Sequence, residues 1–222
     1  SSSNSENDNI AIGFDAMTTN TAGGNANVVV GNYAGDAITS GDNNASIGHT
    51  SLTGVTSGDA NSGLGQHSGA NLTTGSNNTF VGYNSQPSAV DVSNEITFGD
   101  ANVTALRSAD QSIAALSDGR DKTDVVDLPH GLDFINQTRP VRFKWDIRDG
   151  QPGQGKQGTT NYGFIAQELL EIGNNEEHRL VLEDNPDKLE ARYSNLVPMM
   201  AQAIKELSAK VEAQQSEIDT LK

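Results

Sequence analysis

The sequence contains no cysteine among its 222 residues, which excludes a disulfide, a cysteine-ligated zinc site and a cysteine nucleophile. It also lacks any run of about eighteen apolar residues, so we expect no membrane insertion. Its first nine residues, SSSNSENDN, lack the basic start and the apolar stretch of a signal peptide. The net charge is −15, and an acidic chain makes a poor general partner for nucleic acid because the phosphates repel it.

Basic residues are scarcest before a change of composition near residue 116. Residues 1–116 contain ten acidic residues but one basic residue, Arg107, whereas residues 117–222 contain 19 acidic and 13 basic residues. Fifteen of the 23 glycines precede this boundary, and five of the six prolines follow it. Two different architectures are therefore joined here.

The front half contains an internal repeat. A five-residue motif recurs five times and consists of Asn, three mostly small or apolar residues and Gly. Its copies are NIAIG, NVVVG, NASIG, NSGLG and NTFVG. The closing glycines, 17 or 18 residues apart, are Gly13, Gly31, Gly48, Gly65 and Gly82. One short strand per copy cannot bury its own apolar side, whereas stacked copies can, at about 4.8 Å per layer. We therefore predict a mainly β repeat shaft with a period of about 17 over residues 9–86.

One apolar stripe per coil makes a thin core, so we expect identical chains to complete it as a parallel homotrimer. The repeats resemble the coils of trimeric phage tail fibres and trimeric adhesin heads, which implies a trimeric β-helix or β-prism. A monomeric solenoid is the weaker alternative. We further expect a disordered tail at residues 1–8, and a connector with short strands, EITFGD and NVTALRS, over residues 87–116.

Two histidines of the repeats, His49 and His67, lie in or beside the position after the closing glycine. A three-fold axis can turn such a residue into a metal site, but neither histidine recurs in the other copies. We expect polar corner residues, with no metal and no cofactor.

The boundary contains a candidate nucleophile and base. It reads ALSDGRDKTDVVDLP, with Ser117 and Lys122 five residues apart. Serine needs a base to remove its proton, and lysine is a base only when neutral. Burial, or a cation such as Arg120, must therefore lower the lysine pKa towards about 7–8. A charged turn between a strand and a globular domain is the competing interpretation.

The motifs that follow decide between these interpretations. S-D-x-R-x-K precedes DFINQTRPVRFKW, YGFIAQEL, LVLED and YSNLVPMMAQAIKEL. In order and spacing, residues 117–222 closely resemble the intramolecular chaperone domain of phage tail spikes and fibres, the S74 peptidase family. The resemblance implies a trimeric chaperone that folds the β-rich shaft before it. It then cuts itself off with a serine–lysine dyad.

The resemblance also implies residue roles. Ser117 becomes the nucleophile, Lys122 the base and Leu116–Ser117 the scissile bond. Four further residues match the family's motifs and are expected to support the dyad or the fold: Asp118, Arg120, Gln167 and Glu168. Asp121 departs from the leucine that many members have. An acid there opposes proton loss by the lysine, unless it points away or pairs with the neighbouring arginine.

An α+β domain with a long C-terminal coiled coil is expected over residues 117–222. Its predicted order is a short helix at 130–138, the strand VRFKWDI and a projecting glycine-rich loop at 150–161. The strand YGFIA, the helix AQELLEI and a hairpin of RLVLED and LEARYS follow. Four apolar heptads over residues 195–222 predict the coiled coil. The residue types at a and d favour two strands by the general rule, whereas the resemblance implies three.

Two functions from different classes follow. The first is part of a viral tail fibre or spike, whose chaperone domain drives homotrimerisation and shaft folding and then acts once on itself as a serine peptidase. The second is a non-cleaving trimeric fibre or adhesin segment used for host attachment. A protease acting on other proteins is least supported. The resemblance implies assembly in the host cytoplasm and a place in the virion, with a host cell-surface receptor as a further candidate partner.

Overall fold

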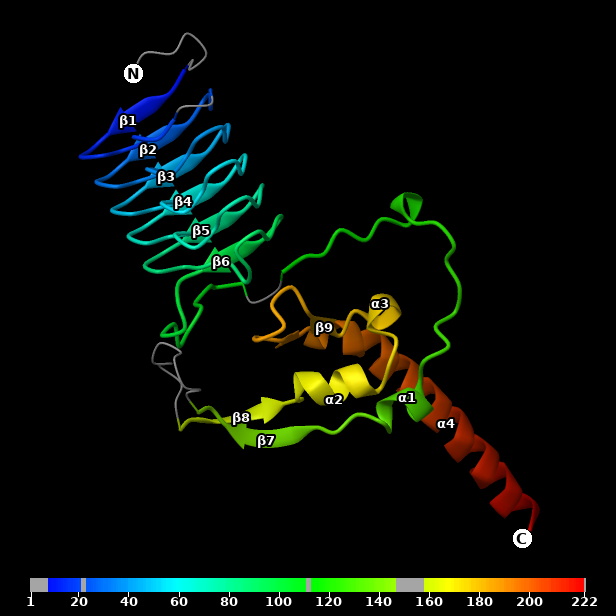
Figure 1. The fold of residues 1–222 in the computed structure, drawn as a ribbon. Helices are drawn as coiled ribbons and strands as arrows, with labels where there is room; N and C mark the ends of the chain where they lie inside the picture. Colours follow the sequence, from blue (N-terminus) through cyan, green and yellow to red (C-terminus); the bar gives the residue numbers. More distant parts are fainter. Residues whose placement is uncertain (1–7, 21–22, 111–112, 147–157, 222) are drawn as a thin grey trace. The chain divides into compact units, whose positions relative to one another are not determined.

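The computed structural model describes residues 8–20, 23–110, 113–146 and 158–221, which belong to two compact units (Figure 1). The first unit contains the repeats and extends to Ala105, and the second contains Leu106–Trp145 and Gly158–Lys222. The predicted tail, except for Asp8, and residues 150–157 of the predicted loop lie outside the described residues. Among the described helices, none combines the length and the apolar character that crossing a bilayer requires.

The first unit is a β-solenoid to which each repeat contributes one short strand (Figure 1). The strands are β1 (Ile10–Ile12), β2 (Val28–Val30), β3 (Ala45–Ile47), β4 (Ser62–Leu64), β5 (Thr79–Val81) and β6 (Ile96–Phe98). All six pair in parallel, in sequence order, so that Val29 faces Ser46 and Phe80 faces Thr97. The predicted stack of β-coils is confirmed, and a single chain builds the whole ladder.

The middle residue of a strand faces the interior of its coil. Val29, Ser46 and Phe80 are buried in this way. Apolar residues from the turns fill the remaining space: Ile38, Leu52, Val55 and Leu72. At the middle of β4 the chain has Gly63, where an added Cβ would lie 2.9 Å from Leu52 Cγ. A large turn residue in one coil thus compensates for a small strand residue in the next.

The asparagine that opens each repeat belongs to a buried ladder along the solenoid. Asn44 Nδ2 donates to Asn27 Oδ1 (3.1 Å) and to the Gly58 carbonyl (2.9 Å). The backbone N–H of Asn61 donates in turn to Asn44 Oδ1 (2.9 Å). The same pattern runs from Asn9 to the backbone of Glu95. Every buried amide of the ladder therefore keeps its hydrogen bonds, which a shorter or apolar side chain cannot reproduce.

The closing glycine of each repeat is fixed by close contact between coils. From Gly13 to Gly65 these glycines have φ between +131° and +141°. A Cβ added to Gly48 would lie 2.3 Å from the carbonyl oxygen of Gly65 in the next coil. Both the backbone angle and the spacing require a residue without a side chain.

The second unit contains short helices, two hairpins and a long helix (Figure 1). Its elements are η1 (Gly119–Asp121), α1 (Leu132–Ile135), β7 (Val141–Lys144), β8 (Thr160–Gly163), α2 (Ala166–Glu171), α3 (Asn175–His178), β9 (Val181–Leu182), β10 (Glu190–Ala191), η2 (Tyr193–Asn195) and α4 (Leu196–Thr220). Strands β7 and β8 pair antiparallel, as do β9 and β10. The other elements follow the predicted order, whereas η1, α3 and η2 were not predicted. Residues 102–108 (NVTALRS), expected as a strand, have no regular secondary structure.

Helix α4 packs one face against the rest of its unit. Leu196 and Met199 are buried in a core that includes Phe134 of α1 and Leu169 of α2. The apolar residues of the predicted heptads lie on another face and are exposed: Val197, Met200, Ile204, Leu207, Val211, Ile218 and Leu221. Within one chain, the long helix therefore carries an apolar stripe that its own core does not cover.

Candidate active site

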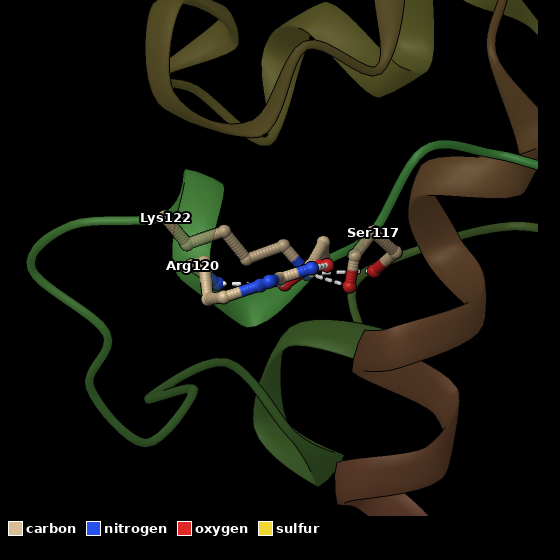
Figure 2. A network of polar contacts seen from close by, with 4 residues as sticks. Ser117, Arg120 and Lys122 are labelled. Atoms are coloured by element: carbon tan, nitrogen blue, oxygen red, sulfur yellow. Dashed lines mark hydrogen bonds and ion pairs between the residues drawn. The ribbon is translucent and has the colours of Figure 1, made fainter.

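Ser117 and Lys122 lie on either side of the single turn η1 (Figure 2). The Asp118 carboxylate caps this turn by accepting a hydrogen bond from the Arg120 N–H (2.9 Å). The turn brings the lysine side chain back alongside the serine. Lys122 Nζ donates to Ser117 Oγ (2.6 Å) and to the Ser117 carbonyl oxygen (3.3 Å).

The Nζ–Oγ contact is short enough for proton transfer between the two side chains. When the lysine is an ammonium, Nζ is the donor. When it is a neutral amine, the serine hydroxyl becomes the donor along the same line, which is the arrangement a serine nucleophile needs. The contact between Ser117 and Lys122 is thus compatible with the predicted serine–lysine dyad.

The dyad lies open to water in a single chain. The Leu116 side chain is fully exposed, and every residue from Ser117 to Lys122 is exposed as well. An exposed site admits another chain, but it lacks the desolvation that favours a neutral lysine.

Arg120 pairs with Asp118. Its guanidinium contacts both carboxylate oxygens, with Nη2–Oδ2 at 2.6 Å and Nε–Oδ1 at 3.1 Å. The hydrogen bonds from the arginine lower the pKa of Asp118, and the same contact raises the pKa of Arg120. The arginine therefore shapes the turn and is compensated by its own carboxylate. This pairing gives no support to the expectation that it acts as a free cation beside Lys122.

The other two family-matched residues lie on α2. Glu168 forms an ion pair with Arg139, whose Nε lies 3.0 Å from Oε2. This contact lowers the pKa of Glu168 through hydrogen bonding and charge attraction. Gln167 is exposed on the same helix. The ion pair ties α2 to the segment before β7, so the geometry associates Glu168 with the fold of the domain.

The two repeat histidines take part in a ladder of rings on the solenoid. Centroid separations are 5.5 Å for Phe14–Tyr33 and 6.0 Å for both Tyr33–His49 and His49–His67. Such spacings follow from the stacking of coils.

A second polar cluster in the second unit has no counterpart in the sequence motifs. It consists of His130, before α1, together with Glu177 and His178 on α3. The histidines are 48 residues apart in the chain, yet their Nε2 atoms are 3.2 Å apart. No local sequence pattern predicts this contact, because the two segments come together only in the folded domain.

Comparison with known proteins agrees with the motifs of the second unit. The family model described as chaperone of endosialidase, Peptidase_S74, matches residues 117–178. The match begins at Ser117 and extends to the end of α3. No curated protein and no solved structure matches the chain. Residues 117–178 are therefore similar to the chaperone-of-endosialidase domain of the S74 family.

Proposed function

We propose that this chain is part of a viral tail fibre or spike whose S74 domain drives homotrimerisation and folding of the solenoid. The domain then releases itself by cleaving the Leu116–Ser117 bond. The observation behind the cleavage step is the 2.6 Å contact between Lys122 Nζ and Ser117 Oγ, at the first residue of the family match.

The proposed reaction needs only the dyad and water. The neutral Lys122 amine takes the proton of Ser117 Oγ, which attacks the carbonyl carbon of Leu116 through a five-membered ring. Collapse of the tetrahedral intermediate breaks the C–N bond. The departing serine amine receives the proton from Nζ, and the leucine acyl group remains on Oγ as an ester. Water then hydrolyses the ester, leaving a carboxylate on Leu116 and a free amine on Ser117.

Two exposed apolar surfaces support the proposed trimer. One is the heptad stripe of α4. The other is the row formed by the last residue of each solenoid strand, in which Ile12, Ile47, Leu64 and Phe98 are exposed and Val30 and Val81 are half-buried. Long apolar surfaces of this kind are typical of interfaces, and parallel copies related by one axis cover the same surface on every chain.

The solenoid gives a physical reason for a folding aid. The coils are nearly alike, so a slip of one repeat between neighbouring chains would again place similar strand residues beside one another. A helical bundle that forms first holds the chains at high effective concentration and in one register. Its later removal leaves a shaft that cannot readily retrace its folding path, which is a form of kinetic stability.

The test compares the unsubstituted chain with Ser117→Ala by denaturing electrophoresis and mass spectrometry. Two fragments of roughly half the chain are expected from the first, one of which begins Ser-Asp-Gly-Arg, and a single intact chain from the second. An intact unsubstituted chain that nevertheless forms trimers would favour the alternative, a non-cleaving fibre or adhesin segment used for host attachment.

A further inference from the structure

Three side chains from two separate segments of the second unit converge on one point. His130 Nε2 lies 3.2 Å from His178 Nε2 and 3.3 Å from Glu177 Oε1. All three atoms lie within 4.8 Å of one another. His178 is buried, whereas the side chains of His130 and Glu177 are 28% and 56% exposed, so the cluster opens to solvent on one side.

The orientation of His178 is fixed by a contact on the far side of its ring. Its Nδ1 lies 3.1 Å from the Gly173 carbonyl oxygen. A carbonyl can only accept, so Nδ1 carries the proton and the neutral ring presents the lone pair of Nε2 to the cluster. A backbone carbonyl behind a ring nitrogen is the usual outer-shell partner of a metal-binding histidine.

The remaining groups are held in place as well. The Asn174 amide donates to the second carboxylate oxygen of Glu177, which leaves Oε1 directed at His130. Phe134 packs against both imidazoles, with ring centroids 5.4 Å from His130 and 4.8 Å from His178. The cluster thus has an apolar wall on one side and positioned donor atoms on the other.

Two of the three separations match the edges of a small coordination sphere. Ligands about 2.0–2.1 Å from a tetrahedral zinc ion stand about 3.3–3.4 Å apart. The contacts that His130 makes, at 3.2 and 3.3 Å, are close to this value. Without an ion, the single proton on His130 Nε2 is shared between two acceptors, which are His178 Nε2 and the carboxylate of Glu177. A bound cation instead satisfies all three lone pairs.

We propose that His130, Glu177 and His178 form a binding site for one divalent transition-metal ion of the zinc class. Two imidazoles and a carboxylate favour such ions over magnesium or calcium, which prefer all-oxygen ligands. Water completes the coordination from the exposed side. The ion ties the segment before α1 to α3, and so stabilises the chaperone unit independently of the chemistry at Ser117.

The test is zinc titration of the chelator-treated full chain by calorimetry, with cobalt(II) absorption as a second measure of tetrahedral coordination. One zinc per chain is expected, with micromolar or tighter affinity. Zinc at a hundredfold excess over its dissociation constant should raise the melting temperature of the second unit by about 10 °C. His130→Gln and Glu177→Gln should weaken binding at least tenfold, as ligand loss does.

The matched control is the double variant His49→Gln/His67→Gln, which removes the other two histidines of the sequence. It should bind zinc like the unsubstituted chain. His178→Gln should abolish binding, but a substitution at this buried position also risks disturbing the fold. His130 is partly exposed, so His130→Gln is the variant that decides. The proposal is overturned if zinc does not bind, if His130→Gln binds it unchanged, if the control variant loses it, or if the stoichiometry is one ion per three chains.

Discussion

At the scale of single residues, the behaviour of Ser117 depends on which atom of its contact with Lys122 holds the proton. The 2.6 Å separation suits either direction of the hydrogen bond. Because only the neutral amine accepts a proton from the hydroxyl, the proposed cleavage is a reaction of the deprotonated lysine.

Substitutions at the dyad should stop cleavage without disturbing the fold, since both side chains are exposed. Ser117→Ala and Lys122→Ala should each remove cleavage, and Lys122→Arg should not restore it, because arginine keeps its proton. Cleavage by the unsubstituted chain should accelerate as the pH rises, because only the neutral amine can take the serine proton. A time course on denaturing gels measures both effects.

The matched control for the lysine is Lys205→Ala, which removes an exposed lysine of α4 and should cleave normally. Continued cleavage by Ser117→Ala, or a released fragment that starts at another residue, would show that this dyad is wrongly assigned.

Glu206 on α4 provides a pH-dependent contact with α1. The backbone N–H of Leu132 (2.8 Å), and secondly the amide of Gln202, lower the pKa of this carboxyl below its ordinary 4.5. A lowered pKa in the fold means that the contact stabilises above pH 4.5 and is lost as the pH falls through the folded value.

We therefore expect the helical signal of the second unit to melt at a lower temperature as the pH falls below this range. Glu206→Gln should reduce that dependence, whereas Glu212→Gln, an exposed position on the same helix, should leave it unchanged. Circular dichroism melts at several pH values measure this dependence. The same pH dependence in the unsubstituted protein, Glu206→Gln and Glu212→Gln would rule out this role for Glu206.

Residue-level prediction from the sequence paired Ser117 with Lys122 but did not predict the contacts around them. The five-residue spacing of Ser117 and Lys122 is compatible with a turn, and the structure brings the side chains together. Arg120 has a carboxylate both before and after it, so only the geometry of η1 shows that Asp118 is its partner. The contact between His130 and His178 depends on packing across 48 residues, for which a sequence contains no local signal.

At the scale of elements, the solenoid strands follow from a five-residue pattern whose two fixed positions have separate physical causes. The asparagine satisfies buried polar groups between coils, and the glycine permits the close approach of neighbouring corners. The three residues between them form the strand.

Removing one rung of the asparagine ladder should destabilise the solenoid. Asn61→Ala deletes the acceptor for the backbone of Asn78 and the donors to Asn44 and to the Gly75 carbonyl. Buried groups left without partners cost about 1–3 kcal/mol, and we expect the free energy of unfolding to fall by about this amount. Urea titration of the solenoid measures it. Asn71→Ala, at an exposed position, is the control, and equal stability of the two variants would contradict the ladder's role.

The sixth strand shows why the repeat count from the sequence falls short by one. In the segment EITFG, Glu95 replaces the opening asparagine, which hides the repeat, although Gly99 lies 17 residues after Gly82. The backbone of Glu95 still bonds to Asn78 Oδ1 (2.9 Å), while its carboxylate accepts hydrogen bonds from Ser88. The later segment NVTALRS has strand-like residues but no neighbouring strand, and strands need partners.

At the scale of the whole molecule, the two units have different roles in the proposed function: the solenoid is the part to be folded, and the second unit assists its folding. The solenoid has many equivalent registers with another chain, and the second unit has a long helix with an uncovered heptad stripe. Ser117 and Lys122 are exposed in one chain, so the proposed mechanism requires that assembly bury them.

Assembly and cleavage should therefore fail together when the heptad stripe is disrupted. Ile204→Lys places a charge on the stripe and should shift the trimer towards monomer in light scattering, with slower cleavage as a consequence. Ala209→Lys, at an exposed position outside the stripe, is the matched control and should remain trimeric. A monomeric unsubstituted chain, or full cleavage by monomeric Ile204→Lys, would contradict the coupling.

The asparagine ladder also determines how such a shaft can change in length. The partner of most rungs is another asparagine 17 residues away, as in the pairs Asn27–Asn44 and Asn44–Asn61, while Asn9 and Asn27 are 18 residues apart. Excising residues 44–60 would join chemically identical neighbours, because Asn61 would then occupy the place of Asn44. Excising only a few residues from this stretch would leave Asn61 out of register with Asn27. Gain or loss of length in this solenoid is thus quantised, with one coil of 17 or 18 residues as the unit that evolution or an engineer can add or remove.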